Sequence, residues 1–182
     1  MKLKFDSNQQ YQLDAIDAVV DIFTGQPANS DDTTRHMDRG RQLGLEATIA
    51  KGNSLVLDTA QIIENTHKIQ EKNGIEKSET KEGGFNLSMN FPLEISEKSL
   101  KYGMNFSVEM ETGTGKTYVY LRTIHELHQH YDWKKFIIVV PSVAIREGVL
   151  KNLAITRGHF ADLYNNPEMD YYVWDSKKTG QA

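Results

Sequence analysis

The fold class of this chain is decided by the stretch Met110-Glu111-Thr112-Gly113-Thr114-Gly115-Lys116-Thr117. It follows residues 106–110, which have the pattern of a strand, and it leads into residues 116–130, whose apolar side chains recur at helical spacing. Between a strand and a helix, the glycines let successive backbone N–H groups point at an anion without a side chain in the way. The lysine adds a charge for the β and γ phosphates, and the last threonine can place its hydroxyl on Mg²⁺. The stretch therefore predicts a phosphate-binding loop (P-loop) at residues 112–117.

A glycine-rich turn that only caps a helix is the alternative interpretation of this stretch. Such a turn requires neither Lys116 nor Thr117, and both are present, which favours phosphate binding. One position departs from the strict P-loop pattern, because Met110 stands where that pattern has glycine.

The residues around the loop predict an α/β fold. Residues 136–140 form a continuous apolar stretch typical of a buried strand, so strand, helix and strand follow one another at the lengths of a βαβ unit. This unit implies a parallel sheet with a right-handed crossover. A further helix is predicted over 143–153 and a further strand over 171–174. Because the sequence stops soon after this strand, we expect the sheet to be incomplete.

The first half of the chain is predicted to be mostly helical. A helix is expected over 8–23, because Ser7 and Gln10 have the spacing of a capping box and Gly25 is a good stop signal. A second helix is expected over 58–72, with a stop at Asn73-Gly74, and alternating residues predict a strand over 85–91.

Composition limits the possible functions. The 182 residues carry a net charge of −4, so no chain-wide positive field exists to hold nucleic acid, and any DNA contact must be local. The absence of cysteine excludes disulfides, thiolate metal sites and cysteine nucleophiles. Because no apolar run approaches the ~20 residues that span a bilayer, and no signal-peptide core follows Met1, we expect a cytoplasmic protein without membrane contact.

Three stretches together resemble the superfamily 2 helicases, and more narrowly the restriction (Res) subunit of type III restriction enzymes. The P-loop resembles motif I of that superfamily. Residues 11–16, with Gln12, resemble its glutamine motif, whose amide reads the adenine edge through its donor and acceptor. Residues 138–147 resemble motif Ia, a strand end and turn that touches the nucleic-acid backbone. The resemblance implies that Pro141, Ser142 and Arg146 contact DNA.

The resemblance implies a RecA-like domain that binds ATP and Mg²⁺. The residues expected to bind ATP are Gln12, Thr112, Gly113, Thr114, Gly115, Lys116 and Thr117, and Thr117 is the expected Mg²⁺ contact. The chain then divides into a glutamine-motif helix at 1–24, an insertion at 25–105 with a mostly helical part before the P-loop, and the first part of the ATP-binding domain at 106–182. Partners implied by the family are DNA and a modification (methyltransferase) subunit.

Catalytic residues are not identifiable in this sequence. An acidic Walker B strand, an arginine finger and the family's nuclease centre are all missing, so we expect an N-terminal fragment that binds ATP but hydrolyses it poorly, whereas the full-length protein is expected to be an ATP-dependent endonuclease. Alternatives are another superfamily 2 DNA helicase, a type I restriction motor, an unrelated P-loop ATPase or kinase, or a non-catalytic nucleotide-binding or docking module. The histidines His125, His128 and His130 could form a metal site or could complement a helix dipole, and the second reading is favoured.

Overall fold

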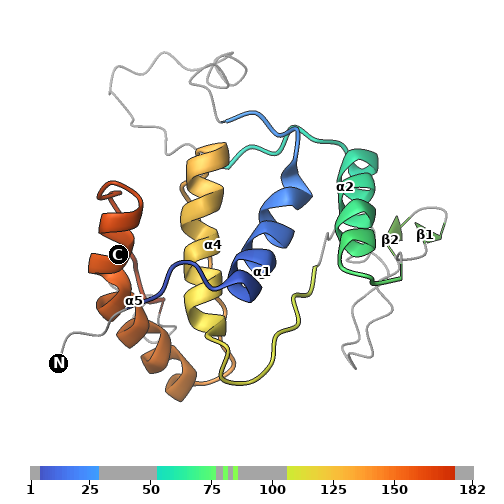
Figure 1. Cartoon of the computed structure of the whole chain (residues 1–182). Helices are drawn as coiled ribbons and strands as arrows, with labels where there is room; N and C mark the ends of the chain where they lie inside the picture. The colour runs from blue at the N-terminus through green and yellow to red at the C-terminus, as the bar shows by residue number, and fades with distance from the viewer. Residues whose placement is uncertain (1–4, 29–52, 77–79, 82–83, 86–105, 175–182) are drawn as a thin grey trace, which may run out of the picture.

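A computed structural model describes residues 5–28, 53–76, 80–81, 84–85 and 106–174 (Figure 1). Within them the elements follow the chain in this order: α1 (Gln10–Val20), the 3₁₀ helix η1 (Asp21–Phe23), α2 (Thr59–Lys72), β1 (Thr80–Lys81), β2 (Gly84–Phe85), α4 (Lys116–Tyr131) and α5 (Val143–Leu163). Figure 1 shows α4 between α1 and α5, with α2 beyond α1. The P-loop therefore leads into the central helix of the described part of the chain.

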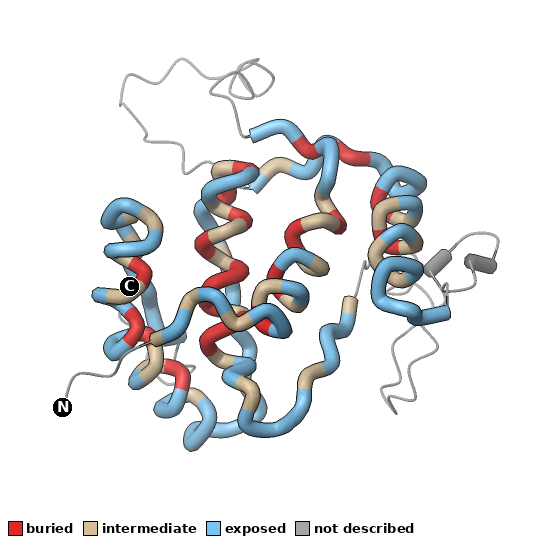
Figure 2. The backbone as a smooth tube through the Cα atoms, in the orientation of Figure 1, coloured by how far each residue is buried: buried red, intermediate tan, exposed pale blue. Residues whose placement is uncertain are grey.

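Two apolar clusters cover opposite sides of α4. The cluster toward α1 contains Ile16, Val20, Val119, Leu127, Tyr131 and Trp133. The cluster toward α5 contains Tyr118, Leu121, Val149, Leu153 and Phe160. Figure 2 shows buried stretches along α4 and along the helices on both sides of it. Because α4 contributes to both clusters, it fixes α1 and α5 relative to the P-loop.

Helix α1 is confirmed as an element, but the predicted capping box is wrong. The N-cap residue is Gln9, and no side chain of the described residues caps this end. The Ser7 hydroxyl bonds to Asn8 instead, while the Ser7 carbonyl accepts a hydrogen bond of 2.6 Å from Nη1 of Arg122. That contact with α4 holds Ser7 outside the helix. The predicted stop is confirmed, since Gly25 has a φ of +93°.

Helix α2 is confirmed, with a capping box that the sequence analysis did not identify. The Asp58 side chain accepts from the Gln61 backbone, and the Gln61 side chain accepts from the Asp58 backbone. Ile62 is fully buried in a third cluster with Ile22 and Leu57, against which Phe106 packs. Asn65 also donates to the carbonyls of η1 and of the turn after it. The described part of residues 25–105 thus shares a core with its neighbours, and the predicted domain boundaries stay a prediction.

Helix α5 is longer than the predicted 143–153. It continues to Leu163 because Leu153, Thr156 and Phe160 keep a buried stripe at helical spacing. Its start is confirmed, since Ser142 is the N-cap and its hydroxyl accepts from the Ile145 backbone.

The predicted parallel sheet stays a prediction. In the described residues the strand pairing is antiparallel, between β1 and β2, with Thr80 opposite Phe85 and Lys81 opposite Gly84. Residues 106–110, 136–140 and 171–174 have no ladder partner within the described part. Ile137 and Val139 are 92% and 87% exposed there. Of the predicted strand 85–91, Phe85 lies in β2, and residues 86–91 lie outside the described residues.

The buried position of Ile62 generates a prediction about α2. We expect Ile62→Ala to lower the free energy of unfolding by about 2–5 kcal/mol, because it leaves a cavity in the cluster around Ile22. The control is Ile75→Ala, at a 59% exposed position, which should change it by about 0.5 kcal/mol or less. Urea unfolding of both variants measures the difference. Equal stabilities would mean that α2 lies outside the cooperative unit.

Candidate nucleotide-binding site

The P-loop has the backbone conformation that its glycines allow. Gly113 and Gly115 have φ values of +86° and +88°, a left-handed region in which residues with a side chain are strained. Gly115 is also the N-cap of α4, so the loop ends at the N-terminus of a 16-residue helix. The free N–H groups and the dipole at such an end favour an anion. This end of α4 therefore suits a phosphate group.

Two polar side chains of the loop converge on one carbonyl. Nζ of Lys116 and Oγ1 of Thr114 each donate to the Glu111 carbonyl at 2.7 Å. The lysine side chain is thus folded back over the loop that it belongs to. Lys116 is exposed, so its ammonium group is accessible to an anion arriving from solvent.

Gln12 contacts the P-loop directly although it lies far away in the sequence. Its Nε2 donates to the Thr114 carbonyl at 2.9 Å, and the side chain is buried, with 8% exposed. A Cβ at Gly115 would lie only 2.8 Å from this Nε2, closer than real Cβ contacts. Glycine at 115 is therefore required twice, for its φ and for the approach of Gln12. The structure brings together the two motifs that the sequence analysis joined.

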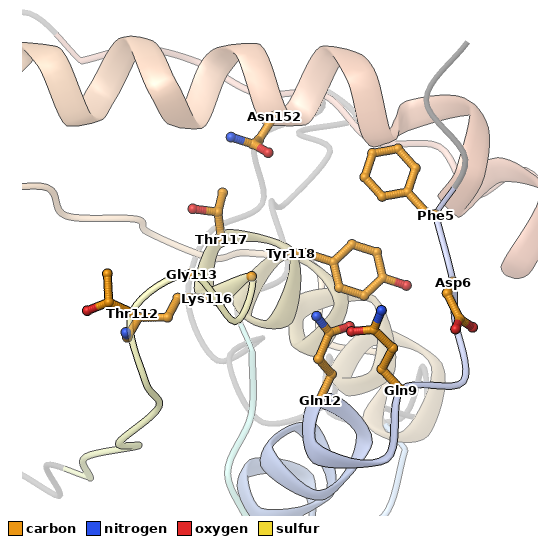
Figure 3. A pocket seen from close by; sticks show the side chains of 11 residues that line it. Phe5, Asp6, Gln9, Gln12, Thr112, Gly113, Lys116, Thr117, Tyr118 and Asn152 are labelled. Carbon is orange, nitrogen blue, oxygen red and sulfur yellow. The ribbon is translucent and has the colours of Figure 1, made fainter.

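A cavity of about 580 Å³ extends from the P-loop to the start of α1 (Figure 3). It is lined by Phe5, Asp6, Gln9, Gln12, Thr112, Gly113, Gly115, Lys116, Thr117, Tyr118 and Asn152. The loop residues form one end, and Gln9 and Gln12 lie side by side at another part of the wall, facing Tyr118. Of the predicted nucleotide-binding residues, Thr114 does not line the cavity, but its carbonyl holds Gln12.

Five lining residues were missed by the sequence analysis. They are Phe5, Asp6, Gln9, Tyr118 and Asn152. A sequence signal existed for three of them, because Phe5, Asp6 and Gln9 directly precede the glutamine motif. Asn152 reaches the cavity from α5, which no local pattern of the sequence predicts.

Aromatic rings close the wall of the cavity next to the start of α1. Phe5 stacks on Tyr118 with ring centroids 5.9 Å apart and an interplanar angle of 10°. The Tyr118 hydroxyl lies 2.8 Å from Nε2 of His159, whose ring also packs on Phe5. Burial raises the pKa of Tyr118 and lowers the pKa of His159, so both side chains are held neutral near pH 7. The stacked, uncharged rings suit the flat face of an aromatic base, while the Asp6 side chain lies beside Phe5 in the lining of the same cavity.

Arg122 connects this wall to α5. Its Nε donates to the Tyr164 hydroxyl at 3.2 Å, and Tyr164 in turn donates to Glu126 at 2.5 Å. Together with the bond from Arg122 to Ser7, this network ties the segment before α1 to the P-loop helix and to the end of α5. Burial raises the pKa of Tyr164, so the phenol stays protonated and acts as a donor.

The predicted DNA contacts lie outside the cavity. Pro141 and Ser142 are exposed at the start of α5, where Ser142 serves as the helix cap. Nη2 of Arg146 lies 3.0 Å from Oε1 of Glu147, so its charge is partly balanced in this structure.

The three histidines near the end of α4 contact other protein groups. Groups of three or more metal-ligating side chains are absent from the described part of the chain. His125 stacks on Tyr164, and burial, followed by the neighbouring His128, lowers its pKa. Nδ1 of His128 and Nδ1 of His130 lie 3.0 and 2.9 Å from backbone carbonyls. The described contacts are those of core and helix-end residues.

Comparison with known proteins identifies the family. The family model described as "Type III restriction enzyme, res subunit" matches residues 7–179. The chain belongs to this family. It is 29% identical over 181 residues to the type III restriction-modification enzyme EcoPI Res subunit of Escherichia phage P1, and 30% identical over 179 residues to the EcoP15I Res subunit of Escherichia coli. These alignments cover 98% and 97% of this chain and 16% of each relative.

A shorter stretch is more similar to a third relative. Over 68 residues, 36% of this chain and 7% of the relative, it is 50% identical to the StyLTI Res subunit of Salmonella typhimurium. This chain thus spans about a sixth of the length of the EcoPI and EcoP15I relatives. In the described part of this Res-family chain, none of the helices is both long and apolar enough to cross a membrane.

The close approach at Gly115 generates a prediction. We expect Gly115→Ala to lower the free energy of unfolding by about 1–3 kcal/mol, because alanine is strained at this φ and its Cβ displaces the Gln12 amide. The control is Gly148→Ala in α5, where a Cβ meets no described atom within 4 Å. The free energy of unfolding of that variant should rise by up to about 1 kcal/mol, because alanine has a higher helix propensity than glycine. Denaturant unfolding compares the two, and an unchanged Gly115→Ala would contradict the observed packing.

Proposed function

We propose that this chain binds Mg-ATP in the cavity between α1 and the P-loop, as part of an ATP-dependent DNA restriction and translocation subunit of a type III restriction enzyme. The observation that carries the proposal is the hydrogen bond from Gln12 to the Thr114 carbonyl, which puts a base-reading amide and a phosphate-binding loop on one cavity. Membership of the Res family supports the same assignment.

Each end of the cavity has the chemistry for one part of the nucleotide. The N-terminus of α4 and the Lys116 ammonium group suit the triphosphate. Thr117 also lines the cavity, and its hydroxyl is the proposed contact with Mg²⁺. The amide groups near Tyr118 and Phe5 suit a base, which offers both a polar edge and a flat apolar face. A bound Mg²⁺ would neutralise phosphate charge, and the residues here orient the nucleotide.

Hydrolysis and DNA cleavage are assigned by this proposal to other parts of the enzyme. The chain spans 16% of its EcoPI and EcoP15I relatives and carries no Walker B acid or nuclease centre that the sequence identifies. We expect it to bind ATP without hydrolysing it at a useful rate, because the charge of the transition state has no arginine to stabilise it. A modification subunit is the proposed partner of the complete enzyme.

Binding of Mg-ATP tests the proposal. We expect Lys116→Ala to lower the affinity for Mg-ATP at least tenfold, because a charge-assisted contact to phosphate contributes about 1.5–3 kcal/mol. The matched control is Lys135→Ala, an exposed lysine outside the cavity, which should bind as the unchanged chain does. Isothermal titration calorimetry measures both. If the unchanged chain fails to bind ATP, or if Lys116→Ala binds equally well, the proposed function is wrong.

The turn before α5 is proposed as a contact with the DNA backbone. Ser142 and Arg146 lie at the first turn of α5, and neither residue lines the cavity. We expect Arg146→Gln to lower the affinity for DNA by a similar factor for all DNA sequences. The salt dependence of this affinity should fall by the amount expected for the loss of about one phosphate contact. Arg157→Gln, further along α5, is the control for loss of a positive charge. Equal salt slopes for the two variants would argue against this contact.

A further inference from the structure

The orientation of the Gln12 amide is fixed by its partner on the P-loop. A backbone carbonyl can only accept, so the atom facing Thr114 at 2.9 Å must be the nitrogen of the amide. The same nitrogen lies 3.5 Å from the Tyr11 hydroxyl oxygen, which takes its second N–H. Both donors of Gln12 are therefore directed to protein oxygens. Oε1, an acceptor, is the polar atom of this side chain that is left for a ligand.

The Tyr11 hydroxyl also orients Gln9, but through the oxygen of the Gln9 amide instead of its nitrogen. Tyr11 accepts from Gln12 and donates its own proton to Oε1 of Gln9, so the three side chains form one directed chain of hydrogen bonds. Nε2 of Gln9 then has no hydrogen-bond acceptor among the described residues. Because Gln9 is an N-cap whose side chain does not cap the helix, this amide is not used by the backbone either. It lines the cavity beside Gln12 (Figure 3).

The two amides together offer one acceptor and one donor to the cavity. Adenine presents the matching pair, since its exocyclic amine donates and the ring nitrogen next to that amine accepts. Guanine presents a carbonyl oxygen in place of the amine, and this oxygen would face the acceptor of Gln12. A single amide that used both of its own groups could also read adenine, but here the nitrogen of Gln12 is bound to the P-loop.

We propose that Gln9 and Gln12 divide the recognition of adenine: Oε1 of Gln12 accepts from the amine, and Nε2 of Gln9 donates to the neighbouring ring nitrogen. Tyr11 is the positioning residue that orients both amides. This inference rests on the proposed binding of ATP and adds the residue that completes the base specificity. It assigns to Gln9 and Tyr11 roles that the glutamine motif alone does not contain.

Nucleotide analogues that lack one ring nitrogen test the assignment. The unchanged 182-residue chain should bind ATP about three- to tenfold more tightly than 7-deaza-ATP or 1-deaza-ATP, whichever lacks the nitrogen that Gln9 contacts. In Gln9→Met, which keeps the length but has no donor, ATP affinity should fall by the same factor and the preference over that analogue should disappear. Tyr11→Phe should reduce the preference partly, because the amide of Gln9 then loses its orientation.

Gln10→Met is the matched control. Gln10 is exposed one residue away, and its side chain bonds to Asp14 rather than to the cavity, so this variant should keep the ratio of the unchanged chain. A general loss of folding would weaken ATP and both analogues together and would leave the ratios intact, and circular dichroism checks the helix content of each variant.

The outcomes separate this inference from the function on which it rests. If ATP binding depends on Lys116 but Gln9→Met discriminates against both analogues as the unchanged chain does, the role of Gln9 is wrong and ATP binding stands. The same holds if the unchanged chain binds ATP and both analogues equally. If the chain does not bind ATP at all, the proposed function and this inference both fail.

Discussion

The hydrogen bond from Gln12 to the Thr114 carbonyl is the contact on which the site depends. It joins the first turn of α1 to the P-loop, and it is possible only because Gly115 leaves room for the amide. The contact also decides which polar atoms of the site remain available, since it engages the nitrogen of Gln12 and leaves the oxygen. This hydrogen bond thus brings the glutamine motif against the P-loop, and it leaves the Gln12 oxygen as the atom that a bound base could contact.

Helix α4 makes this contact stable by holding α1 from two places. Arg122 donates to the Ser7 carbonyl before α1, and the Tyr131 hydroxyl donates to the Val20 carbonyl at its end. Because Lys116 begins the same helix, a displacement of α1 along α4 would change the distance between Gln12 and the P-loop. The apolar clusters supply most of the packing, but these two polar contacts fix the register of the helices.

The sequence predicts the helices well because their signals are local, whereas phosphate binding by the P-loop stays a prediction. Glycines at 113 and 115, the stop at Gly25 and the spacing of apolar residues all act within a few positions. The capping boxes show where this reasoning ends: Ser7 with Gln10 and Asp58 with Gln61 have the same spacing, but Arg122 of a distant helix holds Ser7 outside α1. Asn152 lines the cavity for a similar tertiary reason. The pairing of residues 106–110 and 136–140 in a parallel sheet stays a prediction. Gln9 could have been noticed from its position before Gln12, but its donor becomes significant only once the contact with Tyr11 is known.

The two ends of the cavity differ in what a ligand must displace. Lys116 and Thr114 already donate to the Glu111 carbonyl, so a phosphate gains the ammonium group only by replacing an existing bond. The net contribution of that exchange is the difference between a charged and a neutral acceptor, which is smaller than the gross interaction. Oε1 of Gln12 and Nε2 of Gln9 have no hydrogen-bond partner among the described residues, so a base would replace only water there. The two glutamine amides can therefore contribute to selectivity without the loss of an existing hydrogen bond.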